Sequence, residues 1–121
     1  MDLNNFKTTE AEWLEITDPI GNSTDIRIKV TSRDSELFRK QTRKISELER
    51  KRGVKGLKAA ESERLWTEAL AKCTLEWENV EDNGEEVPYS FENVIDIYTR
   101  YPFVAEQILS FIQDRENFLT S

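Results

Sequence analysis

The sequence contains no histidine and only one cysteine among its 121 residues. Without histidine, the usual Ser-His and Cys-His pairs that activate a nucleophile are absent, and so is the commonest zinc ligand. Cys73 alone can form neither an intrachain disulfide nor a thiolate zinc site. Its place in an apolar helical row predicts a small core residue. We therefore expect a protein that is not an enzyme and that has no catalytic residue, metal site or cofactor.

Long apolar runs and a phosphate-binding loop are also missing. The first ten residues lack the basic start and apolar stretch of a signal peptide, and no run approaches membrane-spanning length. The glycine-containing segment 53–56 lacks both the spacing and the Lys-Ser/Thr ending of a P-loop. These absences predict a cytoplasmic protein with no membrane contact.

The length and composition favour one small globular domain. A chain of 121 residues is of single-domain size, and 34% charged with 37% hydrophobic residues is typical of a well-solvated fold. We assign residues 1–121 to a single domain. Its predicted class is α+β, mostly α, with an N-terminal β-hairpin at about 11–31 and about four helices between about 33 and 119.

The hairpin is predicted from two β-compatible runs at 11–16 and 26–30. In the second run Ile26, Ile28 and Val30 alternate with cations, which is the pattern of a half-buried strand. The residues between the runs, TDPIGNSTD, are rich in turn formers. A lone hairpin is marginal in water, so it must pack on helices or on another copy.

Two helices are predicted next. The first has its N-cap at Thr31-Ser32 and runs to about Arg52, before Gly53 and Gly56. The second runs from about Ala59 to Trp77 along a row of residues four apart. The short glycine-containing link predicts that the two helices form an antiparallel pair.

The segment after Trp77 predicts a turn and two closing helices. Asn83-Gly84 is a tight-turn signal, flanked by Val80 and Val87. Ser90 is a plausible N-cap for the third helix, and Pro102 suits the first position of a fourth, whose apolar face continues to Phe118 and Leu119.

Charge is segregated along the chain. Residues 39–58 hold nine basic and two acidic residues, a net charge of +7, so the rest of the chain carries −14. Residues 76–92 hold seven carboxylates and no cation. Segments of opposite charge attract one another, within a molecule or between copies, and more strongly at low salt. The basic segment 39–58 also permits an alternative function as a small nucleic-acid-linked regulator, although the overall charge of −7 argues against it.

The acidic turn does not fit a calcium loop. If Gly84 takes the glycine position of an EF-hand, Asn79 falls at the first ligand position and Ser90 at the last. The last position requires a bidentate glutamate. A solvated or partner-facing loop is the better interpretation.

Six residues are the candidate partner contacts. Aromatic anchors dominate protein interfaces, and Trp13 lies on a hairpin that cannot stand alone. Cations near a helix C-terminus also interact favourably with its dipole, so the basic residues have a purely local explanation as well. Core sealing is the equally weighted alternative for the aromatics beside Pro88. The candidates are Trp13, Arg43, Lys44, Arg50, Tyr89 and Phe91.

One stretch of this sequence resembles a known family. Trp77 at a helix end is followed by Asn79-Val80, Asp82-Asn83-Gly84, Val87-Pro88-Tyr89-Ser90 and a helix with Asn93. This order, with the hairpin before it and Asn117-Phe118-Leu119 at the end, resembles the small tail assembly chaperones of long-tailed, siphovirus-type bacteriophages. The hairpin sequence and the basic segment match less closely.

The resemblance implies a role in the host cell cytoplasm and absence from the mature virion. Proteins of that family bind the tape measure protein and keep it soluble until tail tube subunits polymerise around it. In many relatives, ribosomal frameshifting yields a longer form that recruits the tail tube protein. The family defines no catalytic residues. Self-association is expected from the charge pattern and from the hairpin's need for a partner.

Overall fold

A computed structural model describes residues 1–53 and 58–120 of the chain. It has a three-stranded antiparallel sheet, a small second hairpin and four α-helices, which confirms the predicted α+β class with its N-terminal hairpin. None of the described helices is long and apolar enough to cross a membrane. The elements are η1 (Leu3–Phe6), β1 (Ala11–Thr17), β2 (Ser23–Thr31), α1 (Glu36–Arg52), α2 (Ala59–Lys72), β3 (Thr74–Glu78), β4 (Glu81–Asp82), β5 (Glu85–Glu86), α3 (Phe91–Arg100), α4 (Pro102–Gln113) and η3 (Arg115–Phe118).

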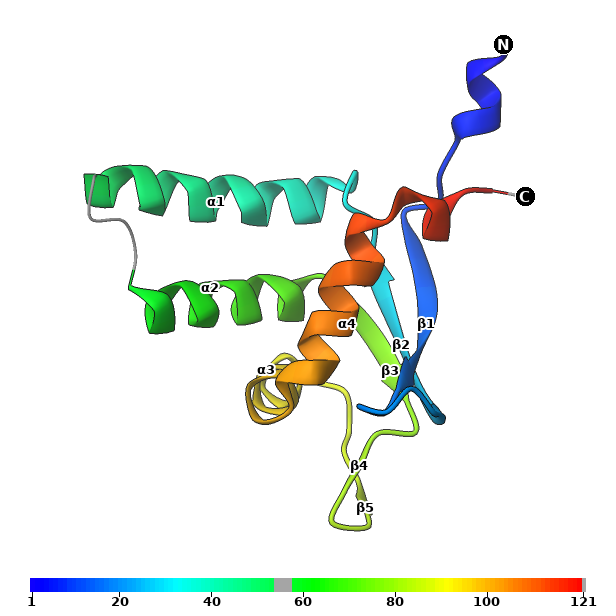
Figure 1. Cartoon of the computed structure of the whole chain (residues 1–121), viewed down its shortest axis with the longest axis vertical. Coiled ribbons are helices and arrows are strands. Elements are labelled where there is room, and N and C mark those ends of the chain that lie inside the picture. The colour runs from blue at the N-terminus through cyan, green and yellow to red at the C-terminus, as the bar shows by residue number, and fades with distance from the viewer. Residues whose placement is uncertain (54–57, 121) are drawn as a thin grey trace.

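The sheet has the order β1-β2-β3, and α4 crosses one of its faces (Figure 1). The predicted alternation decides which face is covered: Ile28 and Val30 are buried with Leu14 and Ile16 of β1. The residues between them, such as Trp13, point to the opposite face. The hairpin therefore packs on helices, and a third strand supports it.

Helices α1 and α2 lie side by side and antiparallel, and they project from the sheet as an arm (Figure 1). The inner stripe of α1 buries Phe38, Gln41 and Ile45. Gly53, with a φ of 67°, follows the last residue of α1, as predicted. The rest of the predicted glycine link, residues 54–57, lies outside the described residues.

The predicted cap of α1 at Thr31-Ser32 is wrong. Both residues still belong to the sheet: Thr31 N–H donates to Cys73 O (3.0 Å) and Ser32 N–H donates to Glu10 O (2.9 Å). The cap is Ser35, whose Oγ accepts from Phe38 N–H at 3.1 Å. Thr31 is the last residue of β2 and α1 begins only at Glu36, so the cap falls on the residue directly before it, Ser35.

The prediction that the second helix continues to Trp77 is also wrong. α2 stops at Lys72, and residues 74–78 form β3, which pairs with β2 so that Trp77 lies opposite Ile28. The row of apolar residues four apart continues through Cys73 and Trp77 by coincidence. Pairing with β2 and burial of Trp77 against the sheet outweigh local helix propensity, which is a weak determinant.

The C-terminal half follows the sequence prediction up to its last turn. The Ser90 Oγ accepts from Asn93 N–H (3.1 Å) at the start of α3, and Pro102 begins α4. α4 ends at Gln113 rather than continuing to Leu119. Phe118 is nonetheless fully buried within η3, where its ring meets Phe111 at a centroid distance of 5.3 Å.

A buried pair of hydroxyls joins β3 to α3. Thr74 Oγ1 donates to Leu70 O (2.9 Å), so the 2.7 Å contact between Thr74 Oγ1 and Tyr98 Oη must have Tyr98 as its donor. Burial raises the pKa of Tyr98, even though the bond to Thr74 acts in the opposite direction. The tyrosine therefore stays neutral and keeps its proton for this bond.

We expect Tyr98→Phe to lower the free energy of unfolding by roughly 1–1.5 kcal/mol, because a buried hydrogen bond is lost while the ring stays. Tyr101→Phe is the matched control, since the Tyr101 hydroxyl bonds Asp82 at the exposed surface (3.1 Å). Urea unfolding of both variants measures the difference. Equal losses would contradict a special contribution from the buried pair.

Candidate functional site

A basic cleft lies along the junction of α1 and α2. The spacing of residues 40, 43, 44 and 47 places them on one side of α1, and Lys72 approaches from the end of α2. The hollow measures about 590 Å³ and contains one carboxylate, that of Glu47, among four cations. Its lining residues are Lys40, Gln41, Arg43, Lys44, Glu47 and Lys72.

The structure thus brings two of the three basic candidates together. Arg43 and Lys44 line the cleft, whereas Arg50 is exposed near the far end of α1 and does not line it. Close to Arg50, Arg52 forms an ion pair with Glu61 of α2 (2.8 Å). Two cations of the cleft, Lys40 and Lys72, are not among the sequence candidates, and Lys72 joins the others only through the packing of α2 against α1.

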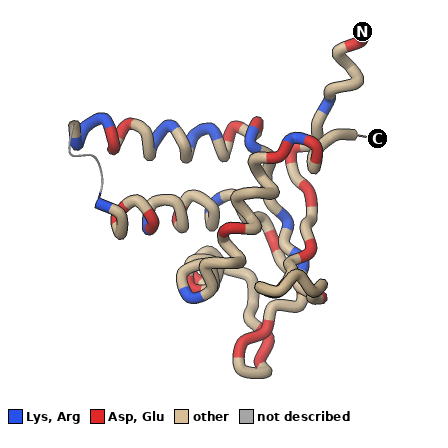
Figure 2. The backbone as a smooth tube through the Cα atoms, viewed as in Figure 1, with Lys and Arg blue, Asp and Glu red and all other residues tan. Residues whose placement is uncertain are grey.

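The acidic turn forms the tight hairpin β4–β5, which projects at the bottom of the view in Figure 2. Asn83 and Gly84 both have positive φ, 53° and 79°, as the Asn-Gly signal predicts for a two-residue turn. Val87 N–H donates to Val80 O (2.8 Å) and closes the base of the hairpin. Among the described residues, no group of three metal-binding side chains is placed to hold a metal ion.

Arg100 holds the acidic turn against α3. Its guanidinium donates to Asp82 Oδ2 and to Asp96 Oδ2, each at 2.8 Å. The hydrogen bond from Arg100 lowers the pKa of Asp82, and the hydroxyl of Tyr101 acts in the same direction. One of the carboxylates in the turn is therefore neutralised within the molecule, while the neighbouring glutamates of β4 and β5 remain at the surface.

The aromatic candidates near Pro88 have different surroundings. Tyr89 Oη donates to Thr74 O (2.7 Å), and its ring stands edge-on to Trp77 at 6.0 Å. Trp77 in turn donates from Nε1 to Val87 O (2.9 Å). Tyr89 thus seals the core, although 43% of it is exposed, while Phe91 is 41% exposed at the start of α3. Of the two, Phe91 is the freer to contact a partner.

Trp13 lies on the sheet face that the helices leave open. The guanidinium of Arg27 stacks over its ring at 4.9 Å, and Arg27 also pairs with Glu78 of β3 (3.4 Å). Trp13, Lys29 and Glu76 are directly aligned across the three strands. The tryptophan is half-buried by its cross-strand neighbours, and the remainder of its surface faces solvent. Its strand, β1, and the arm lie on opposite sides of α4 in the view of Figure 1.

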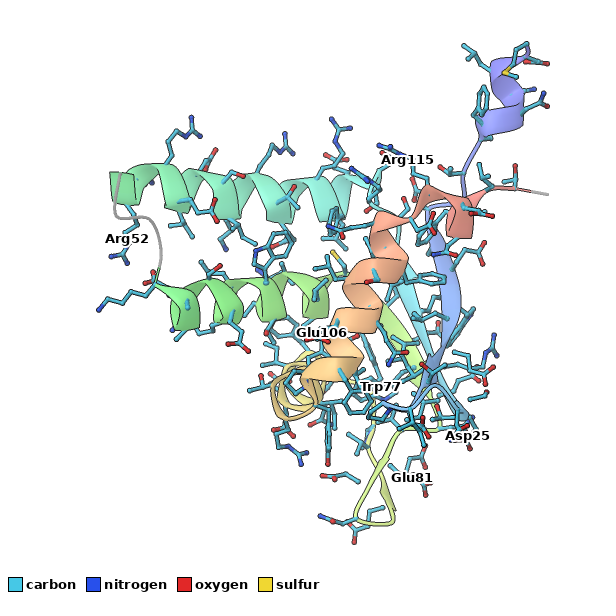
Figure 3. The ribbon with its side chains drawn as sticks, viewed as in Figure 1. Asp25, Arg52, Trp77, Glu81, Glu106 and Arg115 are labelled. Atoms are coloured by element: carbon cyan, nitrogen blue, oxygen red, sulfur yellow. The ribbon has the colours of Figure 1, made fainter. Side chains whose placement is uncertain are left out.

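Figure 3 draws the side chains of the described residues and labels Arg52 on the arm and Glu81 in the acidic turn. It also labels Glu106 on α4 and Arg115 in η3. Arg115 bonds Asp34 through two nitrogens (2.8 and 3.0 Å) and so ties the C-terminal turn to the start of α1.

The comparison with protein families matches residues 32–120 to the model described as "YdaY prophage protein". The chain belongs to this family. It is therefore a phage-derived protein. The matched segment of this prophage protein contains the arm, β3, the acidic turn and all the elements after it, and leaves out η1 and both strands of the N-terminal hairpin. No curated protein and no solved structure matches the chain.

The ion pair between Asp82 and Arg100 makes stability depend on pH. The pKa of Asp82 is lowered from its ordinary value of 3.8 by the bond from Arg100, so its contribution is present above that value and is lost as the pH falls below it. We expect Asp82→Asn to flatten the loss of stability on the acid side of pH 4. Thermal melts between pH 2 and 7 measure this, with Glu85→Gln as the control. If the melting temperature of Asp82→Asn fell below pH 4 as steeply as that of the unaltered protein, the ion pair would not be the cause.

Proposed function

We propose that this prophage protein is a tail assembly chaperone. It binds the tape measure protein, keeps it soluble while the tail tube polymerises, and is absent from the mature virion. One observation supports this proposal above the others. The segment that matches the prophage family, residues 32–120, also contains the stretch from Trp77 to Asn93 that resembles the tail assembly chaperones. The role requires binding surfaces and no bond-making chemistry.

The separation of charge supports this role. The cleft lies where α1 and α2 run side by side, whereas the acidic turn projects from the body of the molecule as the separate hairpin β4–β5 (Figure 2). Between copies, the same two surfaces are complementary. Many copies of a small chaperone that associate weakly through such contacts can cover a long client and still be released.

The other partners follow from the same proposal. The tail tube protein would be recruited mainly through a frameshifted longer form, and the whole process would take place in the host cell cytoplasm. The candidate contacts are the partly buried Trp13 and the exposed Phe91, together with the cations of the arm, Arg43, Lys44 and Arg50. In this proposal the protein is not an enzyme.

The basic cleft is also the feature that favours the second candidate, a nucleic-acid-linked regulator. Four cations around one hollow would suit a phosphate group. The rest of the chain carries a net charge of −14, and no aromatic side chain is among the residues that line the cleft. Titration with duplex and single-stranded DNA or RNA at moderate salt decides between the two candidates.

Co-expression with the tape measure protein of the same prophage tests the proposal directly. We expect the client to remain in the soluble fraction only when this chain is present, because the chaperone covers its aggregation-prone surface. A chain of equal length and charge from outside the family serves as the control. Equal solubility of the client with and without this chain would overturn the proposed function.

Self-association is expected to weaken as salt is raised, since it depends on contacts between the cleft and the acidic turn. The cleft variant Lys40→Glu with Lys44→Glu, and the turn variant Glu81→Lys with Glu85→Lys, should each lose self-association. A mixture of the two variants should associate again, because each supplies the charge that the other now complements. Sedimentation velocity measures all three samples.

The matched controls for these variants are Lys7→Glu and Glu63→Lys, which change charge by the same sign at exposed positions outside both surfaces. An oligomer mass that stays constant from low to high salt, or a mixture that fails to associate, would show that the charge contacts are not responsible.

Trp13→Ala is expected to weaken assembly or client binding by more than it lowers stability. The side chain is half-exposed on the open sheet face, so little core packing is lost. Melting temperature and sedimentation are measured on the same samples, with Leu14→Ala as the core control. A matched drop in melting temperature with unchanged assembly would contradict an interface role for Trp13.

A further inference from the structure

The outer edge of β1 carries backbone groups that no other strand pairs. Ser32 N–H donates to Glu10 O and Thr31 N–H donates to Cys73 O, which fixes the alternation along the hairpin. Residues 10, 12 and 14 of the first strand bond to β2, and residues 9, 11, 13, 15 and 17 therefore direct their N–H and C=O groups away from it.

Both ends of this edge are already occupied. At one end, Thr9 N–H donates to Phe118 O (2.6 Å). At the other, the side-chain amide of Gln107 accepts from Thr17 N–H (2.9 Å) and donates to Thr17 O (2.8 Å), so that it bonds the strand as a neighbouring backbone would. Within the described part of the chain, the outward groups of Ala11, Trp13 and Glu15 have no such partner.

A groove of about 810 Å³ runs beside these open positions, between the edge of β1 and the outer side of α4. Its apolar floor comes from Trp13, Phe103 and Phe111. The charged groups that line it are all carboxylates, and none of its lining residues is lysine or arginine. The carboxylates belong to Glu15, Asp18, Glu106 and Asp114.

We propose that this groove binds an extended, cationic segment of a partner protein, which pairs with Ala11, Trp13 and Glu15 as a fourth strand of the sheet. The main-chain bonds supply affinity without regard to sequence, as in other cases of strand addition. The lysines or arginines of the segment meet the four carboxylates, and its apolar residues contact the three aromatic rings. The site and the chemistry of its ligand do not depend on the chaperone role proposed above.

Charge also argues against a second copy as the occupant. Pairing two β1 edges would bring the carboxylates of both grooves together, with Glu12 of each strand added to them, and like charges at a desolvated contact are costly. The occupied ends limit the added strand to about five residues, roughly 17 Å at the usual rise per residue. A short strand of opposite charge satisfies both limits.

The test uses the full chain and a fluorescent octapeptide of alternating lysine and valine. We expect saturable binding by anisotropy, with amide shift changes in β1 and α4 by NMR. A glutamate-valine octapeptide should bind at least tenfold more weakly, since it repels the carboxylates. An octapeptide with four successive central backbone nitrogens methylated should also bind at least tenfold more weakly, since it cannot donate to β1.

Two protein variants locate the contact. Glu15→Pro removes an outward N–H but no bond to β2, and Glu15→Gln keeps that N–H while removing the same charge. We expect the proline variant to bind more weakly than the glutamine variant, with unchanged far-UV circular dichroism for both. Glu49→Gln with Glu63→Gln, at exposed positions of the arm outside the groove, should leave the affinity unchanged.

The outcomes separate the components of the proposal. Equal binding of the methylated peptide overturns strand addition, and equal binding of the acidic peptide overturns the charge preference. Shift changes confined to the arm or to the β4–β5 hairpin overturn the location. Hydrogen exchange of the β1 amides is also measured without peptide. If self-association of the chain is enough to protect these amides, the occupant is a second copy and the proposal of a cationic partner is wrong.

Discussion

The change from helix to strand at Cys73 and Thr74 positions the other elements of the fold. At this point α2 ends, Thr74 Oγ1 bonds the last turn of the helix, and Cys73 O accepts from Thr31 of the central strand. The two residues are buried. The hydroxyls of Tyr98 in α3 and of Tyr89, which follows Pro88, both form hydrogen bonds with Thr74. A single short segment therefore connects the arm, the sheet and the C-terminal helices. Burial raises the pKa of the Cys73 thiol, so it remains protonated and inert within this junction.

The local signals of the sequence predict local structure well. The alternation of Ile26, Ile28 and Val30, the Asn83-Gly84 turn, the Ser90 cap and Pro102 all act through the conformation of a few neighbouring residues, and each appears as expected. These features give the hairpin, the arm and the closing helices.

The failures concern long-range pairing. Residues 74–78 were predicted to end a helix because the sequence does not show that they pair with the second edge of β2. For the same reason Ser35, rather than Thr31 or Ser32, caps α1. The site residues show the same division: Arg43 and Lys44 could be grouped from their spacing, whereas Lys72 joins them only through the packing of α2 against α1. Gln107 carries no sequence signal for its contact with Thr17, ninety residues away along the chain.

Positive and negative charge lie on different parts of the surface. Cations are concentrated on the arm and carboxylates in the β4–β5 turn (Figure 2), and the charged residues that line the groove beside β1 are also carboxylates. The molecule therefore has one cationic surface and two separate anionic ones. In the assembly role proposed above, this arrangement would allow contact with other copies and with the client at the same time.

The two ends of the chain are bonded to one another. Thr120 N–H donates to Lys7 O (3.1 Å), and Thr8 forms an isolated bridge with Leu119. A fusion, tag or dye at either end would therefore leave the protein at one corner, away from the arm and from the acidic turn (Figure 1). Because Lys7 and Thr120 are hydrogen-bonded, a short linker could join these two segments, and new ends could be opened at Asn83-Gly84. Such a permuted chain would retain every strand pairing of the main sheet.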